Sequence, residues 1–222
     1  KAVKRRRALL HELRHVISHE ELAMHYQPQF TIEDKQCIGM EALMRWQHPK
    51  FGAISPVEFI PLAEESGLIL ELSEWALHTT LKQGKIWQDQ FHKDLKLAVN
   101  LSAKEFNNAK FIKEITKCLH DIDYPPENLK LEITESVMMQ NEQQVVSVMQ
   151  LISSLGVKLS VDDFGTGFSS LSYLQHLPIS QLKIDQSFVK DILTNTESSI
   201  ITQSIIQLGH SLGMNVIAEG VE

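Results

Sequence analysis

The chain has 222 residues and a mass of 25.3 kDa, enough for one large domain or two small ones. Hydrophobic residues make up 43% and charged residues 22%, which excludes a disordered tail, a fibrous repeat and a disulfide-stapled miniprotein. The formal net charge of −7 argues against a broad face for DNA or RNA polymers, but it allows a small phosphorylated ligand held through metal ions.

The cysteines and the apolar runs indicate the compartment. Cys37 and Cys118 form no metal or redox spacing, which is typical of a reducing compartment. Cys118 falls on an apolar helical stripe, so we expect a buried structural thiol. No apolar run approaches ~18 residues, and no signal-peptide core follows the basic stretch Lys1–Arg7. We therefore expect a cytoplasmic location, either as a cytoplasmic protein or as the cytoplasmic part of a membrane-anchored one.

The amino-terminal stretch has a helical pattern, with Leu9 and Leu13 at helix spacing. It starts abruptly with basic residues and no cap, so residues 1–19 are interpreted as a connector helix from an upstream domain, and residues 20–222 as the main domain. His11-Glu12-Leu13-Arg14-His15 fits the H-E-x-x-H zinc pattern. No sheet precedes it and no third ligand has a matching spacing, so we expect a solvated helix face instead.

Strand and helix patterns alternate along the rest of the chain. The predicted strands are Leu22–Phe30, Ile38–Trp46, Leu95–Ser102, Leu129–Ser136, Lys158–Phe164, Gln181–Asp185 and Asn215–Val221. The predicted helices are Glu71–Phe91, Lys110–Asp121, Glu142–Leu155, Ser169–Leu177 and Ser198–Leu212.

Such alternation predicts a parallel sheet with helical crossovers. Only Thr31–Cys37 separates the first two strands, too few residues for a crossover, so they should form an antiparallel hairpin. Seven strands are visible, whereas an eight-stranded α/β barrel needs one more. The sheet is either open or lacks its last strand in this chain. We favour the second interpretation, a modified TIM (β/α)8 barrel that has an antiparallel first strand and lacks its last strand in this chain.

Polar side chains recur near the carboxyl ends of these strands. One parity of each strand is apolar, and the other carries a polar group. That parity comprises Asn100, Glu132, Asp162, Lys183 and Glu219, with Glu41, Leu43 and Arg45 from the second strand. Asp163 follows Asp162 at the junction of the fifth strand with the next loop. Because the carboxyl ends of barrel strands form one mouth, we expect these side chains to converge.

The charge balance of this set predicts a further component. Five carboxylates face at most two cations, and grouped carboxylates do not all stay ionised in a half-buried site without compensation. Proton uptake is one solution and bound divalent cations are the other. Oxygen-only donors favour Mg²⁺ or Mn²⁺, and adjacent Asp162 and Asp163 suit a pair of ions. The alternative is that the polar residues merely end their strands at the solvent.

An ordered series of motifs resembles the EAL-domain family of bacterial cyclic di-GMP phosphodiesterases over nearly all of residues 20–222. The matching segments are Tyr26-Gln27-Pro28, Gly39–Trp46 with its Glu41-Ala42-Leu43, Val99–Ser102, Glu132–Ser136, Asp162–Leu171, Lys183-Ile184-Asp185 and Ala218–Glu222. A three-letter match alone would mean little, but the ordered series is highly specific.

The resemblance implies roles for individual residues. Glu41, Asn100, Glu132 and Asp162 would ligate one Mg²⁺ or Mn²⁺, and Asp162 would bridge to a second ion that Asp163 also holds. Glu219 would act at the metal-bound water as ligand or base, and Lys183 would orient that water. Substrate contacts would come from Gln27, Leu43, Arg45, Asp185 and, on the guanine side, Glu222. Glu135 would brace the glycine-rich loop after Asp163, in which Phe168 replaces a common tyrosine.

The implied reaction is hydrolysis of one phosphodiester bond of cyclic di-GMP to linear 5′-pGpG. Two divalent cations would support it, and Ca²⁺ would hold the substrate uncleaved. The implied assembly is a homodimer, with an upstream cyclase-like or sensor domain in the full-length protein. The rival interpretation is a catalytically silent cyclic di-GMP receptor of the same fold. Such receptors should lack metal ligands, whereas this sequence retains every one within its span.

Overall fold

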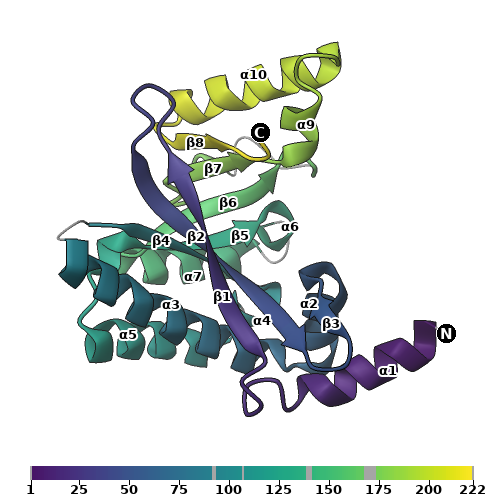
Figure 1. The fold of residues 1–222 in the computed structure, drawn as a ribbon. Coiled ribbons are helices and arrows are strands. Elements are labelled where there is room, and N and C mark those ends of the chain that lie inside the picture. The colour runs from purple at the N-terminus through teal and green to yellow at the C-terminus, as the bar shows by residue number, and fades with distance from the viewer. Residues whose placement is uncertain (1, 92–93, 107, 139–141, 168–173, 222) are drawn as a thin grey trace. The chain divides into compact units, whose positions relative to one another are not determined.

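The computed structural model describes residues 2–91, 94–106, 108–138, 142–167 and 174–221. It consists of two compact units, residues 1–129 (unit 1) and 130–222 (unit 2), which are described separately. Each unit combines a sheet with covering helices, so the predicted α/β class is confirmed (Figure 1).

The sheet of unit 1 starts with a hairpin. Strand β1 (Leu22–Phe30) runs antiparallel to β2 (Cys37–His48), as the short connection predicted. Strand β4 (Lys96–Asn100) then lies parallel to β2. A three-residue strand, β3 (Gly52–Ile54), pairs with the end of β2 and was not predicted, because three residues carry no periodic signal.

The helices of unit 1 are α1 (Ala2–Leu13), α2 (Pro56–Ser66), α3 (Ile69–Phe91), α4 (Ala103–Phe106), α5 (Ala109–Ile122) and the 3₁₀ turn η1 (Pro126–Asn128). Helix α3 packs against α5 and the strands, and Trp87 meets Tyr26 of β1 edge to face with 4.8 Å between ring centroids. Cys118 of α5 is buried, as expected. Helix α2 was missing from the predicted elements, because Pro61 lies inside it and prolines usually interrupt helices.

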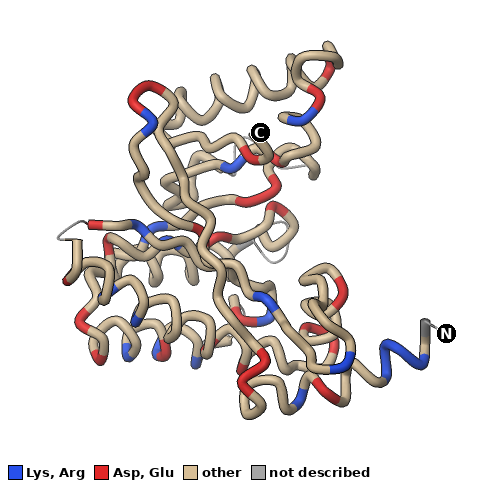
Figure 2. The backbone as a smooth tube through the Cα atoms, viewed as in Figure 1, with Lys and Arg blue, Asp and Glu red and all other residues tan. Residues whose placement is uncertain are grey.

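Helix α1 belongs to the hydrophobic core of unit 1. Leu9, Leu13 and the following Val16 are buried in one cluster with Trp46 and Phe59. Figure 2 shows the basic residues of α1, of which Arg5 forms a two-pronged ion pair with Glu58 of α2, with 2.6 Å between Nε and Oε1.

The H-E-x-x-H pattern does not form a metal site in the described residues. Helix α1 ends at Leu13, so His15 lies beyond it, although the rings of His11 and His15 still meet with 5.9 Å between their centroids. The described groups that could hold a metal contain carboxylates alone.

The sheet of unit 2 is parallel throughout. Strands β5 (Leu129–Thr134), β6 (Lys158–Phe164), β7 (Gln181–Ile184) and β8 (Asn215–Ala218) lie side by side in chain order, β5 starting one residue before the unit boundary. The helices are α6 (Glu135–Met138), α7 (Glu142–Ser154), α9 (Gln186–Lys190) and α10 (Thr196–Ser211). The predicted helix 169–177 lies largely outside the described residues.

The apolar parity of these strands faces the helices, as predicted. Helix α10 packs on β7 and β8, where Gly209 faces Val216 and Leu182. A Cβ on Gly209 would lie 2.4 Å from Val216 Cγ2, so only glycine permits this close approach. The opposite parity is left for the polar side chains. No helix in the described part of the chain combines the length and apolarity needed to cross a bilayer.

Candidate metal centre

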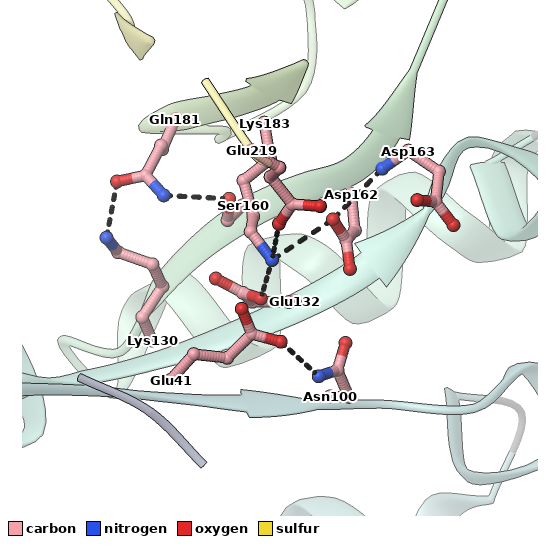
Figure 3. Close-up of polar contacts among 10 residues, drawn as sticks. All are labelled: Glu41, Asn100, Lys130, Glu132, Ser160, Asp162, Asp163, Gln181, Lys183 and Glu219. Carbon is pink, nitrogen blue, oxygen red and sulfur yellow. Dashed lines mark hydrogen bonds and ion pairs between the residues drawn. The ribbon is translucent and has the colours of Figure 1, made fainter. Parts of the chain in front are cut away.

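A buried lysine surrounded by carboxylates forms the centre of unit 2. The Nζ atom of Lys183 lies 2.6 Å from Glu132 Oε2, 2.6 Å from Glu219 Oε1 and 3.1 Å from Asp162 Oδ1 (Figure 3). These residues come from four adjacent strands or their carboxyl ends, as the strand parity predicted. The side chains of Lys183 and Glu132 are 1% and 0% exposed, so each charge depends on its partners for compensation.

Asp163 continues this acidic cluster at the end of β6. Successive strand residues normally point to opposite faces, but Asp163 has a left-handed φ of 53° that breaks the alternation. Asp162, Asp163 and Glu219 consequently offer carboxylate oxygens within 4.8 Å of one another. Burial, followed by the neighbouring Asp162 charge, raises the pKa of Asp163 to about 6. A raised pKa is the expected sign of carboxylates crowded without enough positive charge.

The donor set of unit 2 fits a hard divalent cation. Glu132, Asp162, Asp163 and Glu219 provide four carboxylates against the single Lys183 ammonium, a formal balance of −4 + 1 = −3. The donors are oxygens, with no sulfur or imidazole in the group. Such a set favours Mg²⁺, Mn²⁺ or Ca²⁺ over Zn²⁺ or Cu²⁺.

Glu135 holds the loop that follows Asp163. Its carboxylate is buried, and Oε2 accepts hydrogen bonds from the backbone N–H groups of Gly165 (3.1 Å) and Gly167 (3.0 Å). A Cβ on Gly167 would lie 2.9 Å from the Glu135 carboxylate, so a larger residue here would displace that carboxylate. The acid therefore fixes the backbone two and four residues after Asp163.

Two predicted site residues meet within unit 1. Asn100, at the end of β4, donates from Nδ2 to Glu41 Oε1 of β2 at 2.8 Å. The β1–β2 register places Gln27 opposite Glu41, so the two side chains share one face. Leu43 and Arg45 follow Glu41 on that face, at alternate positions.

The remaining predicted residues lie near the end of unit 2. Asp185 follows β7 and caps helix α9, accepting a hydrogen bond from the backbone N–H of Ser187 at 2.9 Å. Glu222 and Phe168 lie outside the described residues.

Sequence reasoning missed a second polar layer in unit 2. Lys130 donates to Gln181 Oε1, and Gln181 Nε2 donates to Ser160 Oγ at 3.3 Å (Figure 3). All three side chains are buried. Each lies two residues before a member of the acidic cluster, and this shared parity was the signal available in the sequence.

The model of the EAL domain family matches residues 10–222, almost the whole chain. The chain is an EAL domain. This EAL domain is 41% identical over 214 residues to the bifunctional diguanylate cyclase/cyclic di-GMP phosphodiesterase MucR of Pseudomonas aeruginosa, covering 96% of the chain and 31% of that protein. It is 38% identical over 211 residues to the cyclic di-GMP phosphodiesterase NbdA of the same organism, covering 95% of the chain and 27% of that protein. The EAL domain thus spans less than a third of these two relatives.

A solved structure of the PaMucR phosphodiesterase in a c-di-GMP complex has the same fold as this EAL domain. The two agree with a TM-score of 0.94 at 41% identity, over 97% of this chain and 87% of that one. The fold predicted from the sequence, a modified TIM barrel, is confirmed by this match.

Proposed function

We propose that this EAL domain hydrolyses one phosphodiester bond of cyclic di-GMP to linear 5′-pGpG with the help of two divalent cations. The observation that carries the proposal is the acidic cluster around Lys183, in which carboxylates of three further strands or strand ends lie within 3.1 Å of one ammonium. The names of the relatives MucR and NbdA give the substrate and the reaction class.

The proposed ligands divide between two cations. Glu41, Asn100, Glu132 and Asp162 would hold one of them, and Asp162, Asp163 and Glu219 the other. When bound, Mg²⁺ or Mn²⁺ would supply Lewis acidity towards the phosphodiester oxygens and towards water. Support for these assignments comes from the oxygen-only donors and from the excess of acid over base in the cluster.

The side chains of the domain would position the reactants. In the hydrolysis, an oxygen of water bonds to phosphorus, the bond from phosphorus to the 3′ oxygen breaks, and the proton finally resides on that leaving oxygen. Lys183 Nζ would orient the attacking water, and a carboxylate oxygen of Glu219 would accept its proton. Arg45 would contact a phosphate as a two-pronged donor, and Gln27, Leu43, Asp185 and Glu222 would line the substrate.

Product analysis with separate cations tests the proposal. The chain is incubated with cyclic di-GMP and Mg²⁺, Mn²⁺ or Ca²⁺, and the nucleotides are separated by chromatography. We expect pGpG with the first two ions and intact substrate with Ca²⁺. Asp162→Asn should lower turnover by at least ~10³-fold, because it removes a charged ligand shared by both cations. Glu197→Gln, an exposed change in the first turn of α10, is the matched control and should keep full activity.

Binding without cleavage in either Mg²⁺ or Mn²⁺ would contradict the proposal and favour the receptor interpretation. Full turnover by Asp162→Asn would contradict the assignment of the metal ligands. The homodimer, the upstream domain and the cytoplasmic location stay predictions of the sequence.

A further inference from the structure

The polar layer beneath the acidic cluster repeats its strand positions. Lys130, Ser160 and Gln181 precede Glu132, Asp162 and Lys183 by two residues on β5, β6 and β7, respectively. Residues two apart on a strand share one face, and two residues advance the strand by about 6.6 Å. The side chains of Lys130, Ser160 and Gln181, which we call the lower layer, thus face the same side as the cluster, one step towards the amino ends of the strands.

The lower layer holds the lysine in a fixed position. Lys130 is 9% exposed, Gln181 4% and Ser160 0%. The ammonium donates to the carbonyl oxygen of the Gln181 amide, and the NH₂ group of the same amide donates to Ser160 Oγ. Because an ammonium only donates hydrogen bonds, the amide oxygen and not its nitrogen faces Lys130, which leaves the NH₂ group to donate to Ser160.

The position of this ammonium has opposite consequences for the two states of the cluster. Without metal, the four carboxylates exceed the charge of Lys183, and a further positive charge one layer away stabilises them. When divalent cations are bound, the same ammonium repels these cations. The low dielectric of a buried position strengthens both effects relative to water.

We propose that Lys130 is a built-in counter-charge that stabilises the metal-free cluster and weakens the binding of divalent cations. Lys130 would thus act as a positioning residue, through its charge and from the layer beneath the cluster. The inference rests on the proposed metal centre. A merely structural lysine makes a different prediction, because damage to the packing around the ligands would weaken metal binding or leave it unchanged.

Metal binding measured by titration calorimetry with Mn²⁺ alone separates these two roles. Lys130→Met keeps the length of the side chain without its charge, and Lys130→Gln keeps a hydrogen-bonding end without the charge. Both should bind Mn²⁺ roughly tenfold more tightly than the unchanged chain, the order expected for one charge acting on a divalent ion across a partly screened distance. In EDTA, both variants should also melt at a lower temperature than the unchanged chain. Adding Mn²⁺ should raise their melting temperatures by more than it raises that of the unchanged chain.

Two matched variants complete the experiment. Lys130→Arg retains the charge, and its Mn²⁺ affinity should stay within about twofold of the original. Lys158→Met removes an exposed lysine that pairs directly with Lys130 in the β5–β6 ladder, and it should leave the affinity unchanged.

Mn²⁺ binding by the unchanged chain tests the metal centre, and the variants test the role of Lys130. An unchanged chain that binds no Mn²⁺ would overturn the metal centre and this inference with it. Normal binding by the unchanged chain, with equal or weaker binding by the two uncharged variants, would overturn only the role of Lys130. If Lys130→Met folds only when Mn²⁺ is present, the inference is supported. Failure of both uncharged variants to fold even in saturating Mn²⁺ would overturn it.

Discussion

Replacing Lys183 by methionine removes the charge that compensates the acidic cluster while keeping the length of the side chain. The loss falls most heavily on Glu132, whose side chain is 0% exposed and whose Oε2 lies 2.6 Å from the ammonium. Asp162 and Glu219 are 13% and 26% exposed, so water partly replaces the lost partner there. We therefore expect the metal-free domain to lose stability chiefly through the loss of this ammonium from beside the buried Glu132 carboxylate.

The magnitude follows from these exposures. Breaking a buried ion pair by removing one partner costs about 3–5 kcal/mol. The two partly hydrated carboxylates add about 0–1 kcal/mol each. A total near 5 kcal/mol is a large share of the roughly 5–15 kcal/mol that stabilises a typical domain. Bound divalent cations would compensate the same carboxylates, so Mn²⁺ should reduce the difference to less than half.

Urea unfolding followed by circular dichroism measures both quantities, once in EDTA and once in saturating Mn²⁺. Lys190→Met, an exposed change at the end of α9 in the same unit, should shift the free energy of unfolding by less than about 0.5 kcal/mol. A loss below about 1 kcal/mol for Lys183→Met in EDTA would mean that the Lys183 ammonium does not stabilise the buried carboxylates. A difference that stays the same in Mn²⁺ would refute the link between this lysine and the cations.

Three further changes probe the loop, a buried acid and the first helix. Gly167→Ala should lower turnover roughly tenfold, because its Cβ displaces the Glu135 carboxylate and weakens two charge-assisted hydrogen bonds; steady-state hydrolysis of cyclic di-GMP measures this. Burial raises the pKa of Glu105 to about 7. The folded state therefore binds more protons than the unfolded state between about pH 4.5 and 7, and the free energy of unfolding falls as the pH rises through this range. Glu105→Gln should match the unchanged domain at pH 5 and exceed it by about 1–3 kcal/mol at pH 8, in urea titrations. Leu9→Ala should cost about 2–5 kcal/mol in the same assay, because Leu9 is fully buried in the core of unit 1.

Each of these expectations has a contradicting result. Unchanged turnover in Gly167→Ala would mean that hydrolysis does not depend on the bonds from Glu135 to the loop that follows Asp163. If the free energy of unfolding has the same pH profile in Glu105→Gln as in the unchanged domain, burial does not hold this acid protonated. A loss below about 0.5 kcal/mol in Leu9→Ala would mean that α1 is only loosely attached to unit 1.

The inward positions of the cluster were predictable because strand parity is a property of the backbone. Glu132 and Lys183 stand alone among apolar neighbours of opposite parity, and that contrast is visible in the sequence. Asp163 was included because it is adjacent to Asp162 at the strand-to-loop junction, whereas simple alternation points it away from Asp162. Its left-handed φ reverses this direction, and no periodic pattern in the sequence reveals such a φ.

Other features depended on long side chains or on unusual local chemistry. The bond from Lys130 to Gln181 spans two strands, and a pattern of residue types does not reveal how far a lysine reaches. Helix α2 was hidden by Pro61, whereas the strands β1 and β6 were predicted to the residue because apolar and polar residues alternate along most of each strand. Tertiary packing overrides the local signal of Pro61 in α2, and it agrees with the local signals in β1 and β6.

One oxygen atom, Glu135 Oε2, receives the amide hydrogens of both Gly165 and Gly167. The two backbone N–H groups are coupled, because a shift of this one oxygen atom disturbs both hydrogen bonds. This segment should consequently open as a cooperative unit, with the two glycine amides exchanging hydrogen with solvent at similar rates. Any event that moves Glu135 would then reach the backbone after Asp163 in one step.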